Sequence, residues 1–221
     1  MSLPSGYKRL EYIQSSGTQY VDTGFKPNQN TEIQLDVAFL GSVGSNIAGV
    51  RNSNSDATNR FGIITFSSAS KIGAFFRDSA IQAISFDANR HSYKLKKSGL
   101  ELDGTSYGSA NGGSFSCTYN IALFGWNNGS DGIAATSSRV YACKIYDNGT
   151  LVRDYIPCQT TSGDIGLWDD VNSVFYGNAG TGTFEAGPVV ASPSIFVNIN
   201  GIWKPINNIY VNINNIWQKS T

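Results

Sequence analysis

Two carboxylates that alternate along one stretch, Glu101 and Asp103, come closest in this chain to a catalytic acid pair. Carboxyl groups held about 5 Å apart could act as the acid and the nucleophile of glycoside hydrolysis. Gly104 directly follows Asp103, however, and an Asp-Gly pair is typical of a tight turn that ends a strand. No other two of the four glutamates lie close in the sequence. We therefore expect a turn at Asp103 and do not expect an enzyme.

Other catalytic groups are sparse. His91 is the only histidine, so neither a histidine-rich metal site nor a histidine relay is expected. No Gly-x-Ser-x-Gly elbow occurs, and residues 180–182 lack the third glycine of a phosphate-binding loop. Cys117, Cys143 and Cys158 match no zinc spacing. Buried free thiols are the favoured interpretation, with one disulfide as the alternative.

Oxygen-bearing side chains alternate at Asn52, Asn54 and Asp56, as they do in a calcium-binding loop. Ala57 stands where such a loop needs glycine, and Ile63 stands where it needs a bidentate acid. We interpret this stretch as a solvated loop and predict no metal site and no cofactor. A structural Ca²⁺ ion stays open as an alternative that no motif supports.

Two polar loops, residues 51–60 and 127–139, have the composition of a sugar-binding site. An aromatic ring covers the C–H face of a sugar, while amides and carboxylates bracket its hydroxyl groups. Trp126 adjoins the second loop and Trp168 precedes two aspartates, although both tryptophans could equally belong to the core. The predicted ligand-binding residues are Arg51, Asn52, Asn54, Asp56, Trp126, Asn127, Asn128, Asp131 and Trp168.

Asn-Gly and Asp-Gly pairs between short apolar runs indicate the elements that must position these residues. Both residue types tolerate the positive φ values of a two-residue hairpin turn. Residues 31–39 alternate between apolar and polar, which predicts a half-buried strand. The turn pairs lie at 103–104, 128–129, 131–132, 148–149 and 200–201.

Similar short runs continue to residue 176, and no window carries a sustained helical stripe. Regular short strands separated by turn signals favour an all-β fold, a two-sheet antiparallel sandwich. The predicted strands cover 61–66, 72–76, 81–86, 92–95, 100–102, 121–124, 140–146, 151–156, 165–168 and 174–176.

The C-terminal part of the chain is an internal repeat. Two prolines in 188–194 indicate a linker after a main domain of residues 1–187. Within 195–221, Ile-Phe-Val-Asn-Ile-Asn-Gly-Ile-Trp recurs fourteen residues later as Ile-Tyr-Val-Asn-Ile-Asn-Asn-Ile-Trp. Each copy predicts a β-hairpin carrying a tryptophan, Trp203 or Trp217, and two such hairpins are too small to fold alone. We interpret this appendage as an assembly element.

The composition excludes several classes of partner. Sixteen basic residues balance sixteen acidic ones, so the excess positive charge of a nucleic-acid binder is absent. No apolar stretch approaches the about 18 residues of a membrane span, and no signal peptide is visible at Met1. Charged residues make up only 14% of the chain, a composition common in extracellular and virion β-proteins.

Several stretches resemble the laminin-G-like form of the concanavalin A-like lectin/glucanase fold, found in gut bacterial surface proteins and prophage tail proteins. Residues 7–24, Tyr-Lys-Arg-Leu-Glu-Tyr-Ile-Gln-Ser-Ser-Gly-Thr-Gln-Tyr-Val-Asp-Thr-Gly, resemble its first strand, and 93–105 resemble its Asp-Gly hairpin. Residues 121–125, 139–147, 154–158 and 166–178 are similar to its later strands. The resemblance implies a jelly roll whose commonest ligand is carbohydrate. Ser106 replaces the third acid of the glucanase pattern Glu-x-Asp-x-x-Glu.

We therefore expect a non-catalytic glycan-binding module of a bacterial surface or phage tail protein, located on the cell surface, outside the cell or in the virion. The alternative is an architectural domain that assembles, as a homo-oligomer such as a trimer, through the C-terminal hairpins. A third hypothesis, that the chain is a glycoside hydrolase, is supported by the fold resemblance alone.

Overall fold

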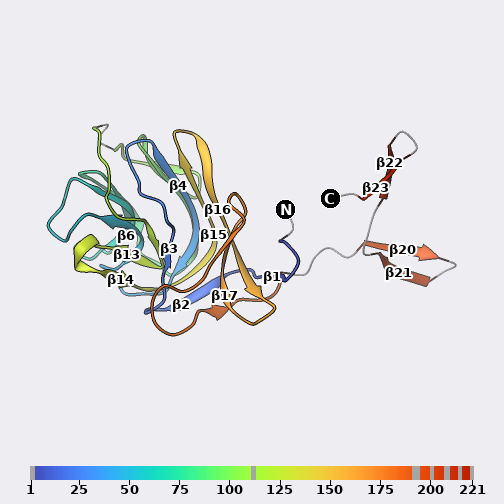
Figure 1. The fold of residues 1–221 in the computed structure, drawn as a ribbon. Coiled ribbons are helices and arrows are strands. Elements are labelled where there is room, and N and C mark those ends of the chain that lie inside the picture. The colour runs from blue at the N-terminus through green and yellow to red at the C-terminus, as the bar shows by residue number, and fades with distance from the viewer. Residues whose placement is uncertain are drawn as a thin grey trace. The chain divides into compact units, whose positions relative to one another are not determined.

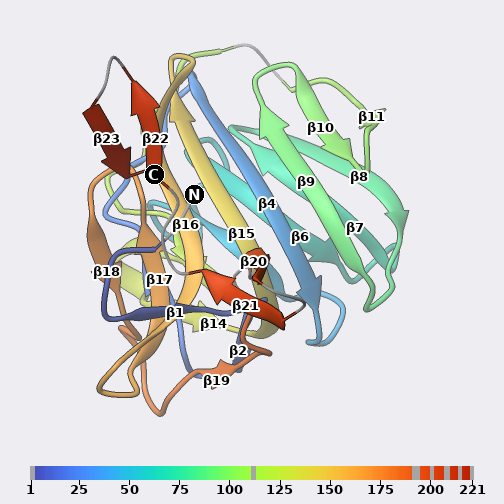
Figure 2. The same ribbon diagram turned by 90° about the vertical axis from the view of Figure 1, so that its right-hand side faces the viewer.

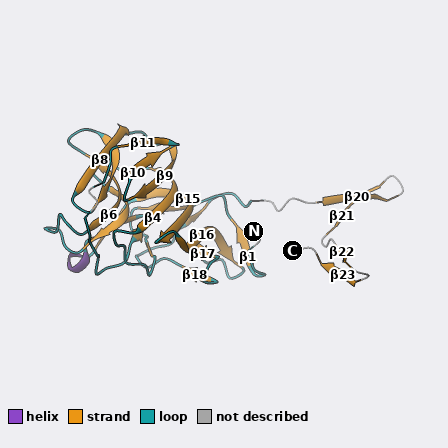
Figure 3. Ribbon diagram, turned by 90° about the horizontal axis from the view of Figure 1, so that it is seen from above, coloured by secondary structure: helices purple, strands orange, loops and turns teal. Residues whose placement is uncertain are grey.

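A computed structural model describes residues 3–110 and 113–190, together with the backbone of the C-terminal strands within 195–199, 202–206, 210–213 and 216–219. Strands dominate these residues, and the single short helical turn is η1 (Gly129–Asp131) (Figure 3). The chain divides into two units, Met1–Val189 and Val190–Thr221. No helix in the described ranges is long and apolar enough to cross a membrane.

The first unit is a sandwich of two sheets, which confirms the predicted all-β fold (Figure 1). The larger sheet comprises β1 (Tyr7–Arg9), β2 (Ile13–Ser16), β4 (Thr31–Phe39), β9 (Arg90–Lys96), β10 (Gly99–Leu102), β11 (Thr105–Tyr107), β15 (Ser137–Asp147), β16 (Thr150–Thr160), β17 (Ile165–Asp169), β18 (Val174–Tyr176) and β19 (Glu185–Ala186). The smaller sheet comprises β3 (Val21–Asp22), β5 (Asn46–Arg51), β6 (Arg60–Phe66), β7 (Lys71–Phe76), β8 (Ser79–Ser85), β12 (Ala122–Leu123), β13 (Gly125–Asn127) and β14 (Ile133–Ala135).

Strand β4 lies in the middle of the larger sheet, between β9 and β15 (Figure 2). Its alternation places Ile33, Leu35 and Val37 in the core, where each is at most 1% exposed. The described strand pairs of both sheets are antiparallel except β13, which runs parallel to β5. The predicted two-sheet antiparallel sandwich is therefore confirmed, with this one parallel pair inside the smaller sheet.

The outer face of the larger sheet is polar. Arg90 and Asp36 form two hydrogen bonds, of 2.7 and 2.6 Å. Lys144 forms an ion pair with Asp154 at 3.2 Å. Pairs of opposite charge on neighbouring strands stabilise a sheet modestly, and they also keep this face wettable.

Two of the predicted hairpin turns are confirmed. Asp103 and Gly104 have φ values of 49° and 78°, and Asn148 and Gly149 have values of 49° and 79°. The pairs at 128–129 and 131–132 do not form separate hairpins, because they form the two ends of η1 in a single connection between β13 and β14. The pair at 200–201 lies outside the described residues.

All three cysteines are buried and free, as predicted. Burial raises the pKa of the Cys117 and Cys158 thiols to about 12. These thiols therefore stay protonated and contribute to the core as small apolar groups.

The second unit consists of two separate antiparallel pairs, β20 (Ile195–Ile199) with β21 (Ile202–Ile206) and β22 (Tyr210–Ile213) with β23 (Ile216–Lys219). The register places Asn198 opposite Trp203 and Asn212 opposite Trp217. The two hairpins thus repeat in backbone pairing as well as in sequence. The linker residues 191–194 lie outside the described residues.

The outer face of the smaller sheet holds a buried indole. Gly49 and Gly62 are cross-strand partners, and a Cβ on either would lie 2.3 or 2.7 Å from the ring of Trp126. The two glycines leave the space that the ring fills, and Phe75 meets the ring edge-on at 6.2 Å. An aromatic ring over paired glycines supplies the packing that the glycines lack.

We predict that Gly49→Ala destabilises the sandwich by about 1–3 kcal/mol, because the new methyl group overlaps the indole and also lies 2.6 Å from the Phe61 carbonyl oxygen. Urea unfolding followed by tryptophan fluorescence measures this cost. Gly177→Ala is the matched control, because its Cβ would meet Phe175 at an ordinary 3.5 Å. Equal stability of the two variants would refute the proposed role of the glycine pair.

Candidate functional site

The predicted loop residues converge at one corner of the sandwich. Residues 52–59 connect β5 to β6, and η1 follows β13. The Arg51 Nε atom donates a hydrogen bond to Asn128 Oδ1 at 2.7 Å. The backbone N–H of Asn54 donates to Asp131 Oδ2, also at 2.7 Å. Hydrogen bonds thus join two loops that lie some seventy residues apart in the sequence.

The corner is closely packed. A Cβ on Gly129 would lie 2.0 Å from the carbonyl oxygen of Asn52 and 2.7 Å from the ring of Tyr119. Asn127 donates to the Asn120 carbonyl at 2.9 Å and accepts from the Gly129 N–H at 3.0 Å. These side chains therefore already make hydrogen bonds within the protein.

The alternating oxygens of 52–56 are also occupied. Asn52 Oδ1 accepts from the Thr118 N–H at 2.8 Å, and Asn54 Oδ1 accepts from Arg51. Partial burial favours the neutral form of Asp56, but hydrogen bonds from Asn59 and Thr58 outweigh it and lower its pKa to about 2. Within the described ranges no three His, Cys, Asp or Glu side chains gather as a metal site. The geometry agrees with a loop that is held by its own hydrogen bonds.

The two tryptophans proposed as stacking surfaces are buried instead. Trp126 is 2% exposed because it lies over the glycine pair described above, and Trp168 is 9% exposed. The Trp168 ring packs against Tyr7 with a centroid distance of 4.8 Å. Neither indole presents an open face to a ligand. The exposed aromatic residue of the corner is Tyr119, at 38%, which the sequence did not single out.

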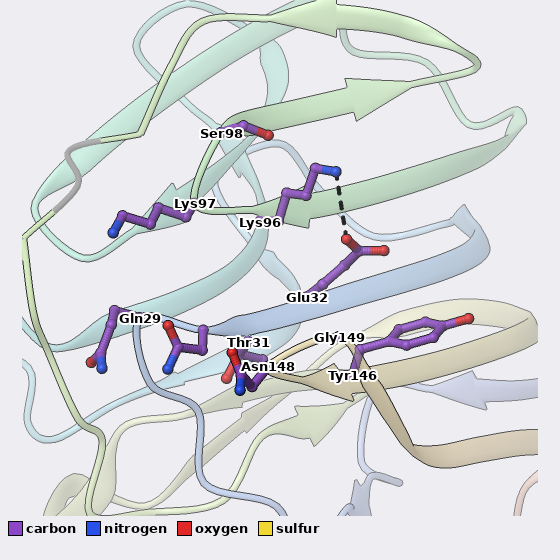
Figure 4. Close-up of a pocket in the computed structure, with 10 residues that line it drawn as sticks. Gln29, Thr31, Glu32, Lys96, Lys97, Ser98, Tyr146, Asn148 and Gly149 are labelled. Atoms are coloured by element: carbon purple, nitrogen blue, oxygen red, sulfur yellow. Dashed lines mark ion pairs between the residues drawn. The ribbon is translucent and has the colours of Figure 1, made fainter.

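An open groove lies elsewhere, at the end of the larger sheet where β4 begins. It has a volume of about 640 Å³, within the range of small-molecule sites. Three segments form it: the residues leading into β4, the β9–β10 turn and the β15–β16 turn (Figure 4). Its lining consists of Gln29, Asn30, Thr31, Glu32, Lys96, Lys97, Ser98, Tyr146, Asn148 and Gly149.

Backbone geometry fixes the groove. The Asn148 N–H donates to the Asn30 carbonyl at 3.1 Å, which ties the β15–β16 turn to the start of β4. Tyr146 stands opposite Glu32 in the strand register, so both side chains lie on the outer face of the sheet. Lys96 reaches Glu32 from β9, with 3.7 Å between the charged atoms (Figure 4).

The groove differs from the corner in its unused hydrogen-bonding capacity. The side-chain amides of Asn30 and Asn148 are exposed and make no hydrogen bond within the described protein. The Gln29 side chain accepts one long hydrogen bond, of 3.4 Å, from the Phe115 N–H. It donates no hydrogen bond within the described residues. Tyr146 is half-buried and lines the same groove. An aromatic ring and two unpaired amides therefore line one concave space, the combination of groups that the sequence placed at the corner.

The residues considered for acid catalysis lie outside the groove. Asp103 sits in the β10–β11 turn, and Glu101 forms an ion pair with Lys94 at 3.7 Å. Glu32 is the only acid in the groove lining, and Gln34 donates a hydrogen bond to its Oε1 at 2.7 Å. A single carboxylate bound in this way can hold a hydroxyl group, whereas glycoside hydrolysis uses two.

No protein-family model matches the chain, and a search of curated proteins found no relative.

His91 belongs to a separate cluster at the far end of β9. Its Nδ1 lies 2.6 Å from Asp103 Oδ2, and its Nε2 lies 2.8 Å from Asp87 Oδ1. Burial opposes protonation of the ring, but the hydrogen bonds to Asp103 and Asp87 outweigh it and raise the pKa of His91. With both nitrogens engaged, the histidine is held as a link between two turns and has no free atom for a relay.

We predict that His91 makes stability depend on pH. Because its pKa is raised on folding, its contribution is complete below the unfolded value of about 6.5 and is lost as pH rises through the folded value. Urea unfolding from about pH 5.5 to about pH 9 should show a decline in the unfolding free energy. His91→Gln should flatten that decline, and a wild-type curve that rises over this window would contradict the assignment.

Proposed function

We propose that this chain is a non-catalytic glycan-binding module and that the groove beside β4 is its binding site. One observation carries the proposal: the exposed, unpaired amides of Asn30 and Asn148 line the same concave space of about 640 Å³ as the Tyr146 ring. The ring suits the C–H face of a sugar, and amides suit its hydroxyl groups. Glu32 and Lys96 add charged partners for further hydroxyls.

The energetics require such a combination. Covering about 100 Å² of apolar surface contributes roughly 2.5 kcal/mol, at about 25 cal/mol per Å². Even millimolar affinity needs about 4 kcal/mol. Each hydrogen bond from an amide adds about 1 kcal/mol net. Tyr146 alone is therefore insufficient, and Tyr146 with two or three amides reaches weak but measurable binding.

The proposal places the module on a bacterial surface, outside the cell or in a phage tail. The support is the resemblance of residues 7–178 to laminin-G-like domains of such proteins, together with the low charge content of 14%. The two-sheet sandwich described above is compatible with that resemblance.

We predict that Tyr146→Ala weakens binding of an oligosaccharide identified on a glycan array by about tenfold or more, because it removes the apolar platform. Asn30→Ala should weaken it about fivefold through loss of one hydrogen bond. Isothermal titration measures both effects. Tyr119→Ala is the matched control, since Tyr119 lies outside the groove lining. Loss of binding in that variant but not in Tyr146→Ala would move the site to the corner.

A second proposal concerns the C-terminal hairpins, which we assign as an assembly element of a homo-oligomer such as a trimer. The supporting observation is that β20–β21 and β22–β23 each form a two-stranded sheet by itself. An isolated two-stranded hairpin is marginally stable in water, so each needs a covering surface. Weak sugar sites would gain avidity from such multiplicity.

We predict that the full chain forms an oligomer and that a chain ending at Val189 is a monomer with an unchanged sandwich. Light scattering measures the mass of both, and circular dichroism checks the fold. Trp203→Ala and Trp217→Ala should weaken assembly, because aromatic residues contribute strongly to interfaces. A full chain that stays monomeric at high concentration would exclude this role.

A further inference from the structure

The charges that line the groove do not cancel. Lys96, Lys97 and Glu32 are its ionisable residues besides Tyr146, so two ammonium groups face one carboxylate. Lys96 and Glu32 lie 3.7 Å apart, beyond hydrogen-bond distance. Lys97 is exposed and has no ion-pair partner within the described residues. The groove therefore carries one uncompensated positive charge.

The neighbouring surface adds one lysine and one acid, so it brings no further net charge. A small hollow beside the groove shares Lys96 and Ser98 with it and adds Lys94, whose ammonium group lies 3.7 Å from Glu101. Both ion pairs are partly exposed, so each contributes little stability, and little free energy is needed to separate the charged groups. A ligand that lies along the groove would meet three lysine side chains of β9 and its turn.

Asp147 lies between two lining residues in the sequence, but its register position opposite Thr31 turns its side chain to the other face of the sheet from Tyr146. Its Oδ1 accepts a hydrogen bond from Asn28 at 3.2 Å. It is not part of the groove lining. In Figure 4 the Lys96 and Lys97 side chains extend from one side of the groove, and Gln29, Asn148 and Tyr146 lie on the other.

We infer that the groove selects anionic saccharides, chains that carry carboxylate or sulfate groups, over uncharged ones. The inference rests on the proposed glycan-binding function and adds the chemical class of the ligand. Tyr146 and the amides of Asn30 and Asn148 hold the sugar ring. Lys97 supplies the unpaired charge, and Lys96 exchanges its loose contact with Glu32 for the anionic group of the ligand.

The test compares three tetrasaccharides on the full chain by isothermal titration: one of uronic acids, the same chain with its carboxyl groups reduced to alcohols, and a sulfated version of that reduced chain. We expect both anionic probes to bind at least about threefold more tightly than the reduced one, since exposed ion pairs are individually weak. Raising NaCl from about 50 to about 500 mM should remove the difference by screening. The two anionic arms distinguish carboxylate from sulfate as the preferred group.

Lys97→Gln should lose most of the preference while still binding the reduced tetrasaccharide. Lys8→Gln, an exposed lysine on β1 outside the groove, is the matched control and should keep the preference. Equal affinity for all three probes, or a preference that survives in Lys97→Gln, would overturn the inference and leave glycan binding standing. Absence of binding to any saccharide would overturn both proposals together.

Discussion

The alternation of β4 is the constraint on which the rest of the molecule depends. Ile33, Leu35 and Val37 face the second sheet and are almost fully buried, while Glu32 and Asp36 face outward. Because side chains alternate with a period of two, a slip of one residue would bury the acids and expose the aliphatic groups. The register of β4 against β9 and β15 is therefore strongly specified, and the outer face of the sheet follows from it.

The groove is a direct consequence of that register. With β4 fixed, Tyr146 stands opposite Glu32, and the β9–β10 and β15–β16 turns close beside the start of the strand. The positive φ of Asn148 allows a two-residue turn, which brings its amide to the rim and its N–H to the Asn30 carbonyl. The binding surface thus sits on turns that the core sheet holds in place, as is usual for β-sandwiches.

The sequence predicted the all-β sandwich, the strand at 31–39, the turns at 103–104 and 148–149 and the buried thiols, because these are local signals of alternation and turn chemistry. It did not predict the groove, whose three segments are distant in the chain and meet only when the sheet pairs. The Asn148-Gly149 pair predicts a turn alone. Lys96 and Lys97 fall between the predicted strands 92–95 and 100–102, where no signal marks them as binding residues. The sequence left Trp126 open between a binding loop and the core, because a loop neighbour says nothing about the paired glycines of β5 and β6 that its ring covers.

The terminal strands of the two sheets differ in length, and this affects how readily another chain could pair with them. The larger sheet terminates in β11 and β18, each three residues long, whereas the smaller sheet terminates on one side in the seven-residue β8. Short terminal strands offer little backbone for a foreign chain to join. β8 contains no charged residue and no proline, the features that ordinarily protect such an edge. Of these terminal strands of the sandwich, β8 therefore offers the most backbone for a foreign chain to join, and a lysine on its solvent-facing side is where solubility engineering should start.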